Sequence, residues 1–284
     1  MAVDVKLQKI MIDGGFTCPN RDGRVGRGGC SFCLCESFNP QYCRRHSSIA
    51  EQIEAGKDFF RNKYPRMRYL AYFQAYTSTY APVDVLRRRY DEALAVEDVI
   101  GLVVATRPDC VDDDVLSLLD SIRERGYSVT VELGCESFYD RTLVRINRGH
   151  SAASSVEALR LCHARGIPVT VHLILGLPGE SRDDILAEAD MINALPVTSL
   201  KLHQLQILRG ARIAEEWEHN KGDFLVFTME SYAGLAAAFV RRLRDNIHVE
   251  RFVSSAPVDM LLAPRFGVRP AVVEARIREL LRRA

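Results

Sequence analysis

The sequence has no long apolar run and almost no net charge. No stretch approaches the ~18–20 consecutive apolar residues that a membrane-spanning helix needs. The first ten residues, MAVDVKLQKI, also lack the apolar core of a secretory signal. The formal net charge is +1, so no strong overall positive field points to nucleic acid. We therefore expect a cytoplasmic protein without a membrane segment.

Internal repeats, low-complexity tracts and long linkers are also absent from the sequence. The chain has 284 residues, of which 47% are hydrophobic. That length is enough for one large α/β domain with a substantial core, or for two small domains.

Cysteine, by contrast, is plentiful: the chain has eight. Without a secretion signal, such a number favours reduced thiols and metal ligation over disulfides. Cys18, Cys30 and Cys33 lie in the segment GGFTCPNRDGRVGRGGCSFC, with the spacing C-x11-C-x2-C. A 4Fe-4S cluster normally takes four protein ligands. Three cysteines would leave one iron open to another ligand.

A structural zinc site is the main alternative for these cysteines. Zinc prefers four nitrogen or sulfur ligands. Cys35 and Cys43 could complete such a set, and His46 is also near in the sequence. The same two cysteines could instead bind a second, auxiliary metal.

Short apolar runs alternate with longer amphipathic segments through the first two thirds of the chain. The predicted strands are residues 6–12, 69–76, 100–106, 128–134, 168–175 and 199–205. The predicted helices between them are residues 47–62, 83–96, 111–125, 151–165 and 182–194. Such alternation favours parallel strands joined by right-handed crossovers.

The predicted fold class is therefore α/β, a partial (βα)6 barrel over residues 1–206. Residues 207–284 should form a mainly helical extension packed on the barrel. Within it we expect helices at 228–245, 256–263 and 270–283, and one more short strand near 248–253.

Three consecutive predicted strands each have one apolar face and one polar face. If helices cover the apolar faces, four polar side chains point into the barrel: Glu132, His172, Lys201 and His203. A barrel interior is usually filled with branched apolar side chains. The polar interior suggests a bound ligand, although these side chains could instead pair with one another.

The carboxyl ends of parallel strands are the usual place for an active site in such folds. Several polar or glycine-rich positions fall there: Gln74, Tyr76, Arg107, Glu136 and the turn GLPGE, with Gly176 and Gly179. Glycines let the backbone approach a ligand closely. Alternatively, Arg107 and Glu136 form a structural ion pair, and the GLPGE segment is a plain strand–helix turn.

Seven motifs in order resemble the radical S-adenosylmethionine (radical SAM) superfamily. They are IDGGFTCPNRDGRVGRGGCSFC, YFQAYTSTYAPVDVL, TRPD, VELGCES, INRGH, HLILGLPGE and KLHQLQIL, with the CxxC pair closing the first. Together they cover roughly residues 6–265. They are most similar to the YtqA/YhcC-like (MnmL-like) branch, which is related to the radical SAM domain of the Elongator catalytic subunit.

The resemblance implies a 4Fe-4S cluster on Cys18, Cys30 and Cys33, with S-adenosylmethionine at the open iron. Reductive cleavage would give a 5′-deoxyadenosyl radical that abstracts hydrogen from the substrate, while the protein supplies binding and orientation. The implied cofactor-binding residues are Phe32, Gln74, Tyr76, Arg107, Glu136, Arg148, His172, Gly176 and Gly179.

Particular roles follow from the same resemblance. Phe32 would pack near the adenine, as would the turn at 176–180. Glu136 would contact the methionyl or ribose part, and His172 falls where some relatives bind the ribose. Arg148 would pair with the carboxylate, to which its fixed fork is suited.

The resemblance also implies partners. The substrate would be a wobble uridine in tRNA, whose carboxymethylaminomethyl side chain becomes aminomethyl before a separate methyltransferase acts. Flavodoxin or ferredoxin would be a suitable electron donor. Three arginine clusters could contact phosphates, at 44–45, at 87–89 and at 241–244. Two alternatives stay open: a radical SAM enzyme acting on a small molecule or peptide, and a non-enzymatic zinc or iron–sulfur protein.

Overall fold

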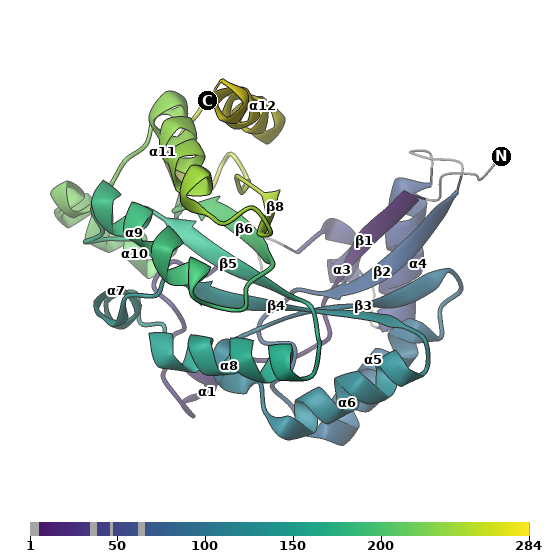
Figure 1. Cartoon of the computed structure of the whole chain (residues 1–284). Coiled ribbons are helices and arrows are strands. Elements are labelled where there is room, and N and C mark those ends of the chain that lie inside the picture. The colour runs from purple at the N-terminus through teal and green to yellow at the C-terminus, as the bar shows by residue number, and fades with distance from the viewer. Residues whose placement is uncertain (1–5, 35–38, 46–47, 62–65, 284) are drawn as a thin grey trace.

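A parallel β-sheet forms the centre of the molecule and curls into an open half-barrel (Figure 1). The computed structural model describes residues 6–34, 39–45, 48–61 and 66–283. In spatial order, the strands of this sheet are β1 (Lys6–Ile12), β2 (Met67–Phe73), β3 (Val99–Thr106), β4 (Ser128–Glu136), β5 (Val169–Leu175), β6 (Ser199–Gln204) and β8 (His248–Arg251). Each neighbouring pair is parallel. The expected α/β partial barrel is confirmed.

Helices connect successive strands and cover the outside of the sheet (Figure 1). They are α1 (Pro19–Asp22), α3 (Gln41–Arg45), α4 (Ile49–Phe60), α5 (Val83–Leu94), α6 (Asp113–Glu124), α7 (Asp140–Arg145), α8 (Ala152–Ala164), α9 (Arg182–Asn193), α10 (Arg212–His219), α11 (Met229–Arg242) and α12 (Pro270–Arg282). Short 3-10 turns lie at Pro108–Cys110 and Lys221–Asp223.

Side-chain caps explain where several helices begin. Ser48, Ser181 and Thr228 each accept a hydrogen bond from the backbone two or three residues into the helix, in a reciprocal capping box. Such caps satisfy backbone N–H groups that the first turn leaves without helical partners. The local sequence therefore fixes these helix starts before any packing is considered.

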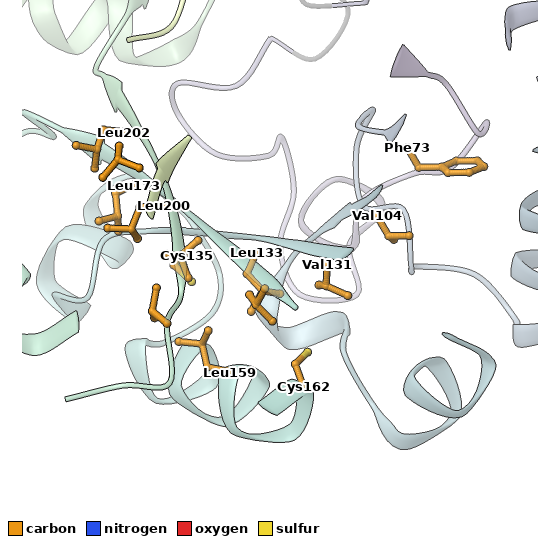
Figure 2. Packing of buried hydrophobic residues seen from close by; sticks show 14 of the residues in the cluster. Phe73, Val104, Val131, Leu133, Cys135, Leu159, Cys162, Leu173, Leu200 and Leu202 are labelled. Carbon is orange, nitrogen blue, oxygen red and sulfur yellow. The ribbon is translucent and has the colours of Figure 1, made fainter. Parts of the chain in front are cut away.

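The main core lies between the sheet and its helices. Figure 2 shows Leu159 and Cys162 of α8 facing the strand residues Leu133 and Cys135. All four side chains are almost fully buried. Because side chains alternate along a strand, the apolar positions of β4 turn toward the helices and Glu132 turns into the half-barrel.

The C-terminal region differs from the sequence-based expectation in one segment. Residues 256–263 were expected to be helical, but Leu261–Ala263 form strand β9, which pairs antiparallel with β7 (Ile207–Leu208). Pro257 and Pro264 bracket this segment, and proline disfavours helix in the residue before it and lacks an N–H donor. A helix has too little room between them.

The strand expected near 248–253 is present as β8, and it extends the main sheet beside β6. Helix α11 packs against α9 and α12, which places the C-terminal helices over one end of the sheet (Figure 1). The C-terminal region is thus largely helical but contributes one strand to the half-barrel. A domain boundary at 206/207 stays a prediction. Within the described ranges, no helix is both long and apolar enough to cross a membrane.

Candidate active site

The three cysteines of the C-x11-C-x2-C motif line one cavity of about 170 Å³. The loop that carries them follows β1, and the cavity wall continues over residues at the carboxyl ends of β2, β3 and β4. Cys30 is buried, whereas Cys18 and Cys33 are partly exposed. The structure therefore brings the expected metal ligands to the expected edge of the sheet.

Nitrogen donors approach the cysteine sulfurs. Arg148 Nη1 lies 3.3 Å from Cys30 Sγ, and Asn20 Nδ2 lies 3.7 Å from the same sulfur. Arg21 Nη2 lies 3.5 Å from Cys33 Sγ. Burial raises the pKa of the Cys30 thiol, and the charge of Arg148 opposes that shift. Thiolates are the form that ligates iron, and N–H groups around the sulfurs stabilise it.

The arrangement of the three sulfurs is compatible with a cluster. Among the described residues, no three His, Cys, Asp or Glu side chains converge on one metal-ion position. In a 4Fe-4S cluster each thiolate binds a different iron, so the three sulfurs need not converge. The donor set in this cavity therefore fits the cluster.

A second metal at Cys35 and Cys43 is not tested. Cys35 and His46 lie outside the described residues. Cys43 is buried, and its Sγ donates to the backbone oxygen of Met11 at 3.3 Å. The auxiliary site stays a prediction.

Most of the expected cofactor-binding residues share the cysteine cavity. Its wall includes Phe32, Gln74, Tyr76, Arg107, Glu136, Arg148 and His172. Two buried polar atoms here, Gln74 Oε1 and Arg148 Nε, have no hydrogen-bond partner. Buried polar atoms normally have partners. An acceptor and a cationic donor left open in one wall fit the ammonium and carboxylate of an amino-acid ligand such as S-adenosylmethionine.

Backbone strain is concentrated in the same wall. Tyr76 (φ 59°) and Glu136 (φ 67°) are left-handed although neither is glycine. Glu136 also follows a register shift between β4 and β5. Such conformations cost about 1–3 kcal/mol each and are found where a function requires them. Here they turn two polar side chains, one after β2 and one at the end of β4, toward one cavity.

Two expected residues do not line this cavity. Gly176 and Gly179 both have positive φ, of 88° and 81°. A Cβ on Gly176 would lie 2.5 Å from Phe227 Cε2, and one on Gly179 would lie 2.9 Å from Arg145 Nη1. Close packing against other segments thus accounts for both glycines. Their contact with adenine stays a prediction.

The alternative of an ion pair between Arg107 and Glu136 is wrong. Arg107 Nε instead donates to Asp109 Oδ1 at 2.8 Å, and its Nη1 donates to the backbone oxygen of Arg148 at 2.8 Å. Glu136 Oε1 lies 3.5 Å from Arg148 Nη2. The left-handed turn at Glu136 directs its carboxylate toward Arg148, and Asp109 is close enough in sequence to occupy Arg107.

Polar side chains inside the half-barrel form a network around Glu132. This fully buried carboxylate accepts from Lys9 Nζ at 2.9 Å, Tyr72 Oη at 2.6 Å and Lys201 Nζ at 2.5 Å. His172 Nε2 lies 2.8 Å from it. Burial favours the neutral acid, but His172 and the two lysines outweigh burial and hold the pKa of Glu132 well below its usual range.

Pairing with one another was the alternative to ligand binding for the four polar side chains expected inside the barrel. Three of them do pair in this way: Glu132, His172 and Lys201. His203 is the exception. Its ring stacks near that of His172, with centroids 5.3 Å apart, and its buried Nε2 has no hydrogen-bond partner.

A larger cavity of about 670 Å³ opens beside the cysteine cavity. The two share five lining residues: Phe32, Cys33, Gln74, Glu136 and His172. They are therefore parts of one hollow. The larger part is walled by the ends of β5, β6 and β8 and by the start of α12, where His203, Arg251 and Glu274 lie.

Sequence reasoning missed several residues in or beside this hollow. Asn20 and Arg21 follow Cys18 by two and three positions, and this closeness was an available signal. Lys9, Tyr72 and Arg251 come from strands distant in the sequence, and nothing local marks them as neighbours of the site.

Comparison with known proteins agrees with this geometry. Residues 20–192 match the model of the radical SAM superfamily, and residues 197–283 match that of a radical SAM C-terminal domain. Protein YhcC of Escherichia coli K12 is 42% identical over 259 residues, covering 91% of this chain and 82% of YhcC. The uncharacterized protein YtqA of Bacillus subtilis is 36% identical, covering 93% and 81%.

Two more distant proteins carry a known description. A tRNA uridine(34) acetyltransferase of Dehalococcoides mccartyi is 27% identical over 186 residues, covering 62% of this chain and 39% of that protein. The structure of Elp3 from Methanocaldococcus infernus superimposes with a TM-score of 0.72 at 16% identity, covering all of this chain and 64% of that one. The latter likeness concerns the fold.

The half-barrel, the cysteine cavity and the two family matches lead to one conclusion. The chain belongs to the radical SAM superfamily, whose members use a 4Fe-4S cluster and S-adenosylmethionine.

Proposed function

We propose that this radical SAM enzyme acts on a wobble uridine in tRNA and converts a carboxymethylaminomethyl side chain to aminomethyl. The observation that carries the proposal is the single hollow in which the three cysteines adjoin a cavity of about 670 Å³. That volume lies in the range of small-molecule sites and suits one extruded nucleoside. Partial similarity to a tRNA uridine(34) acetyltransferase supports the substrate class.

The proposed reaction breaks the bond between the side-chain nitrogen and its carboxymethyl carbon. Abstraction of one hydrogen from that carbon, loss of one further electron and addition of water release glyoxylate and leave the amine. When bound, the cluster and S-adenosylmethionine supply a 5′-deoxyadenosyl radical and serve overall as the two-electron oxidant.

The residues of this chain bind and orient the reactants. Cys18, Cys30 and Cys33 would hold the cluster. Arg148 and Gln74 would receive the carboxylate and ammonium of S-adenosylmethionine, since each has a buried polar atom without a partner. The shared wall between the two cavities then sets the substrate beside the cofactor.

The arginine clusters give this proposal little support. Arg88 pairs with Asp84 at 2.7 Å, and Arg244 donates to the backbone oxygens of Asn193, Leu195 and Val197. Arg241 and Arg242 also contact protein groups. The side chains of residues 44–45 lie outside the described set. Phosphate contacts would have to come from other surfaces.

Anaerobic reconstitution followed by nucleoside mass spectrometry tests the proposal. With a reductant such as reduced flavodoxin or ferredoxin, we expect cleavage of S-adenosylmethionine and conversion of the wobble nucleoside in undermodified tRNA. A separate methyltransferase would use the product. Cys30→Ala should abolish cluster formation and conversion, while Cys162→Ala, on the buried face of α8, should retain both.

Different failures have different meanings. Normal cleavage with an unchanged wobble nucleoside would reject tRNA as the substrate and favour a small molecule or a peptide. One tightly bound zinc ion and no cleavage would reject the enzymatic function itself.

A further inference from the structure

We propose that Arg251 is the anion-binding residue of the substrate cavity and that His203 binds a polar group of the same substrate. The ligand class is a nucleoside or nucleotide with an oxyanion. This inference rests on the proposed function, because it deepens the description of the same hollow. The oxyanion has two chemical sources, a carboxylate on the base side chain and a phosphate of the backbone.

The position of Arg251 is fixed by the sheet. It ends β8, which pairs with β6, and its register partner there is Lys201. Arg251 lines the larger cavity, as do Cys33 and Glu136 of the shared wall. A ligand that contacts both Arg251 and this wall would bring its reacting carbon toward the cysteines.

The carboxylates that line the larger cavity all have cationic partners of their own. Glu274 accepts from Arg278 at 2.7 Å, and Glu136 lies 3.5 Å from Arg148. Glu250 has several partners and is considered next.

Glu250 is held away from Arg251 although the two are adjacent in sequence. Its Oε2 accepts from Lys9 Nζ at 3.1 Å, and its Oε1 accepts from Ser199 Oγ at 2.8 Å and Thr170 Oγ1 at 2.9 Å. Lys9 also forms an ion pair with Glu132, and Lys201 forms a second ion pair with Glu132. The two lysines thus balance the two carboxylates.

Arg251 is the cation that remains. No hydrogen bond or ion pair to it is found among the described residues, and its side chain is exposed. A guanidinium presents a planar fork that matches carboxylate and phosphate oxygens. An unpaired arginine in the wall of a deep cavity is therefore suited to an anionic ligand.

His203 supplies a second, neutral contact. Burial, with the nearby charges of His172, Arg251 and Lys201, holds the pKa of His203 well below its usual range, so the ring is uncharged at neutral pH. Its Nε2 is buried and unpartnered, and the residue lines the same cavity as Arg251. Neutral imidazole can accept a hydrogen bond from the protonated secondary amine of the proposed side chain.

The test measures equilibrium binding of three nucleosides and one nucleotide to the reconstituted protein, without reductant. The carboxylate probe is 5-carboxymethylaminomethyluridine, and its neutral match is the corresponding carboxamide. The phosphate probe is uridine 5′-monophosphate, and its neutral match is uridine. No turnover is needed, so this experiment is read separately from tRNA conversion.

We expect wild-type protein to bind one anionic probe about tenfold more tightly than its neutral match. The pair that shows this preference identifies the source of the oxyanion. Arg251→Gln should remove the preference, and Arg251→Lys should retain part of it. His203→Phe should weaken the carboxylate probe and its carboxamide alike, because both carry the amine.

Arg160→Gln is the matched control, since Arg160 is an exposed arginine on α8, away from both cavities. It should bind all four probes like wild type. Equal affinity of wild type for anionic and neutral probes, or a preference that survives in Arg251→Gln, would overturn the assignment. Thermal melting of each variant separates loss of binding from loss of folding.

Discussion

The guanidinium of Arg148 lies 3.3 Å from the sulfur of Cys30, and both side chains are buried. Arg148 belongs to the INRGH motif and lies 118 positions after Cys30 in the chain. We expect a buried cation beside this proposed cluster ligand to stabilise its thiolate and the reduced cluster. This contact therefore links the motif after β4 to the cysteine loop after β1.

Replacing Arg148 should change the cluster without unfolding the chain. Arg148→Gln removes a positive charge next to Cys30, so we expect less iron per chain after reconstitution and a more negative reduction potential. An EPR-monitored redox titration measures the potential, and Arg160→Gln serves as the control. A potential equal to that of wild type would show that Arg148 does not tune the cluster.

Glu132 should be a large contributor to stability. Glu132→Gln leaves the buried Lys201 without its carboxylate, and breaking a buried ion pair from one side costs about 3–5 kcal/mol. Urea unfolding measures this loss. Glu54→Gln breaks the exposed pair with Lys57 and should cost less than about 1 kcal/mol. Similar losses in both variants would contradict the structural role of the network.

The same carboxylate predicts an acid limit to stability. The pKa of Glu132 is held well below its usual range in the folded protein. Its contribution is therefore complete above the unfolded value of about 4.3 and is lost as pH falls through the lower folded value. Unfolding free energies of wild type and Glu132→Gln should converge at acidic pH.

Ser137 lies between two buried acids, and we predict that one of the two carries a proton. Its Oγ lies 2.7 Å from Glu180 Oε1 and 2.8 Å from Glu188 Oε1. A hydroxyl has only one proton, so one of these short contacts needs a proton from a carboxyl group. Burial raises the pKa of both acids, and for Glu188 the nearby Glu180 adds to the shift.

This pair should destabilise the protein as pH rises. Stability from a carboxyl with a raised folded pKa is complete below the unfolded value, about 4.3, and is lost as pH rises through the folded value. Glu188→Gln keeps a donor for Ser137 and removes the titration. Between the unfolded and the folded pKa of Glu188, the unfolding free energy of Glu188→Gln should rise relative to that of wild type. We expect this rise to be up to about 1.4 kcal/mol per pH unit.

Thermal melts between pH 5 and 9 measure the difference for Glu188→Gln. Glu157→Gln, an exposed change on α8, should show no such pH-dependent gain. Parallel stability curves for wild type and Glu188→Gln would mean that the two buried acids do not share a proton.

Glycine at 176 should be required by packing. Gly176→Ala places a Cβ 2.5 Å from Phe227 Cε2 at a φ of 88°, so we expect a loss of about 1–3 kcal/mol in unfolding free energy. Gly234→Ala, inside α11 with open space around it, should instead stabilise by about 0.5–1 kcal/mol. If Gly176→Ala leaves the unfolding free energy unchanged, packing does not require glycine at this position. The expected contact of this turn with adenine would then be the better explanation of the glycine.

The sequence by itself was enough for the fold class and for the order of most strands and helices, and it predicts the cysteine ligands. These features are written locally, in the period-2 pattern of strands such as 128–134, in capping residues such as Ser181, and in the spacing of Cys18, Cys30 and Cys33. The local pattern predicted a helix at 256–263, and this prediction was wrong. Pro257 and Pro264 disfavour a helix there, and pairing with β7 stabilises strand β9 instead.

Tertiary structure decided which side chains meet. Arg107 could have faced Glu136 on sequence grounds, and Glu132 could have faced a ligand. Only the curl of the sheet brings Lys9 and Lys201 to Glu132, and only the pairing of β8 with β6 places Arg251 in the wall of the larger cavity. Ion pairs of this kind depend on distances of a few ångströms between strands far apart in the chain, and no local sequence pattern specifies such distances.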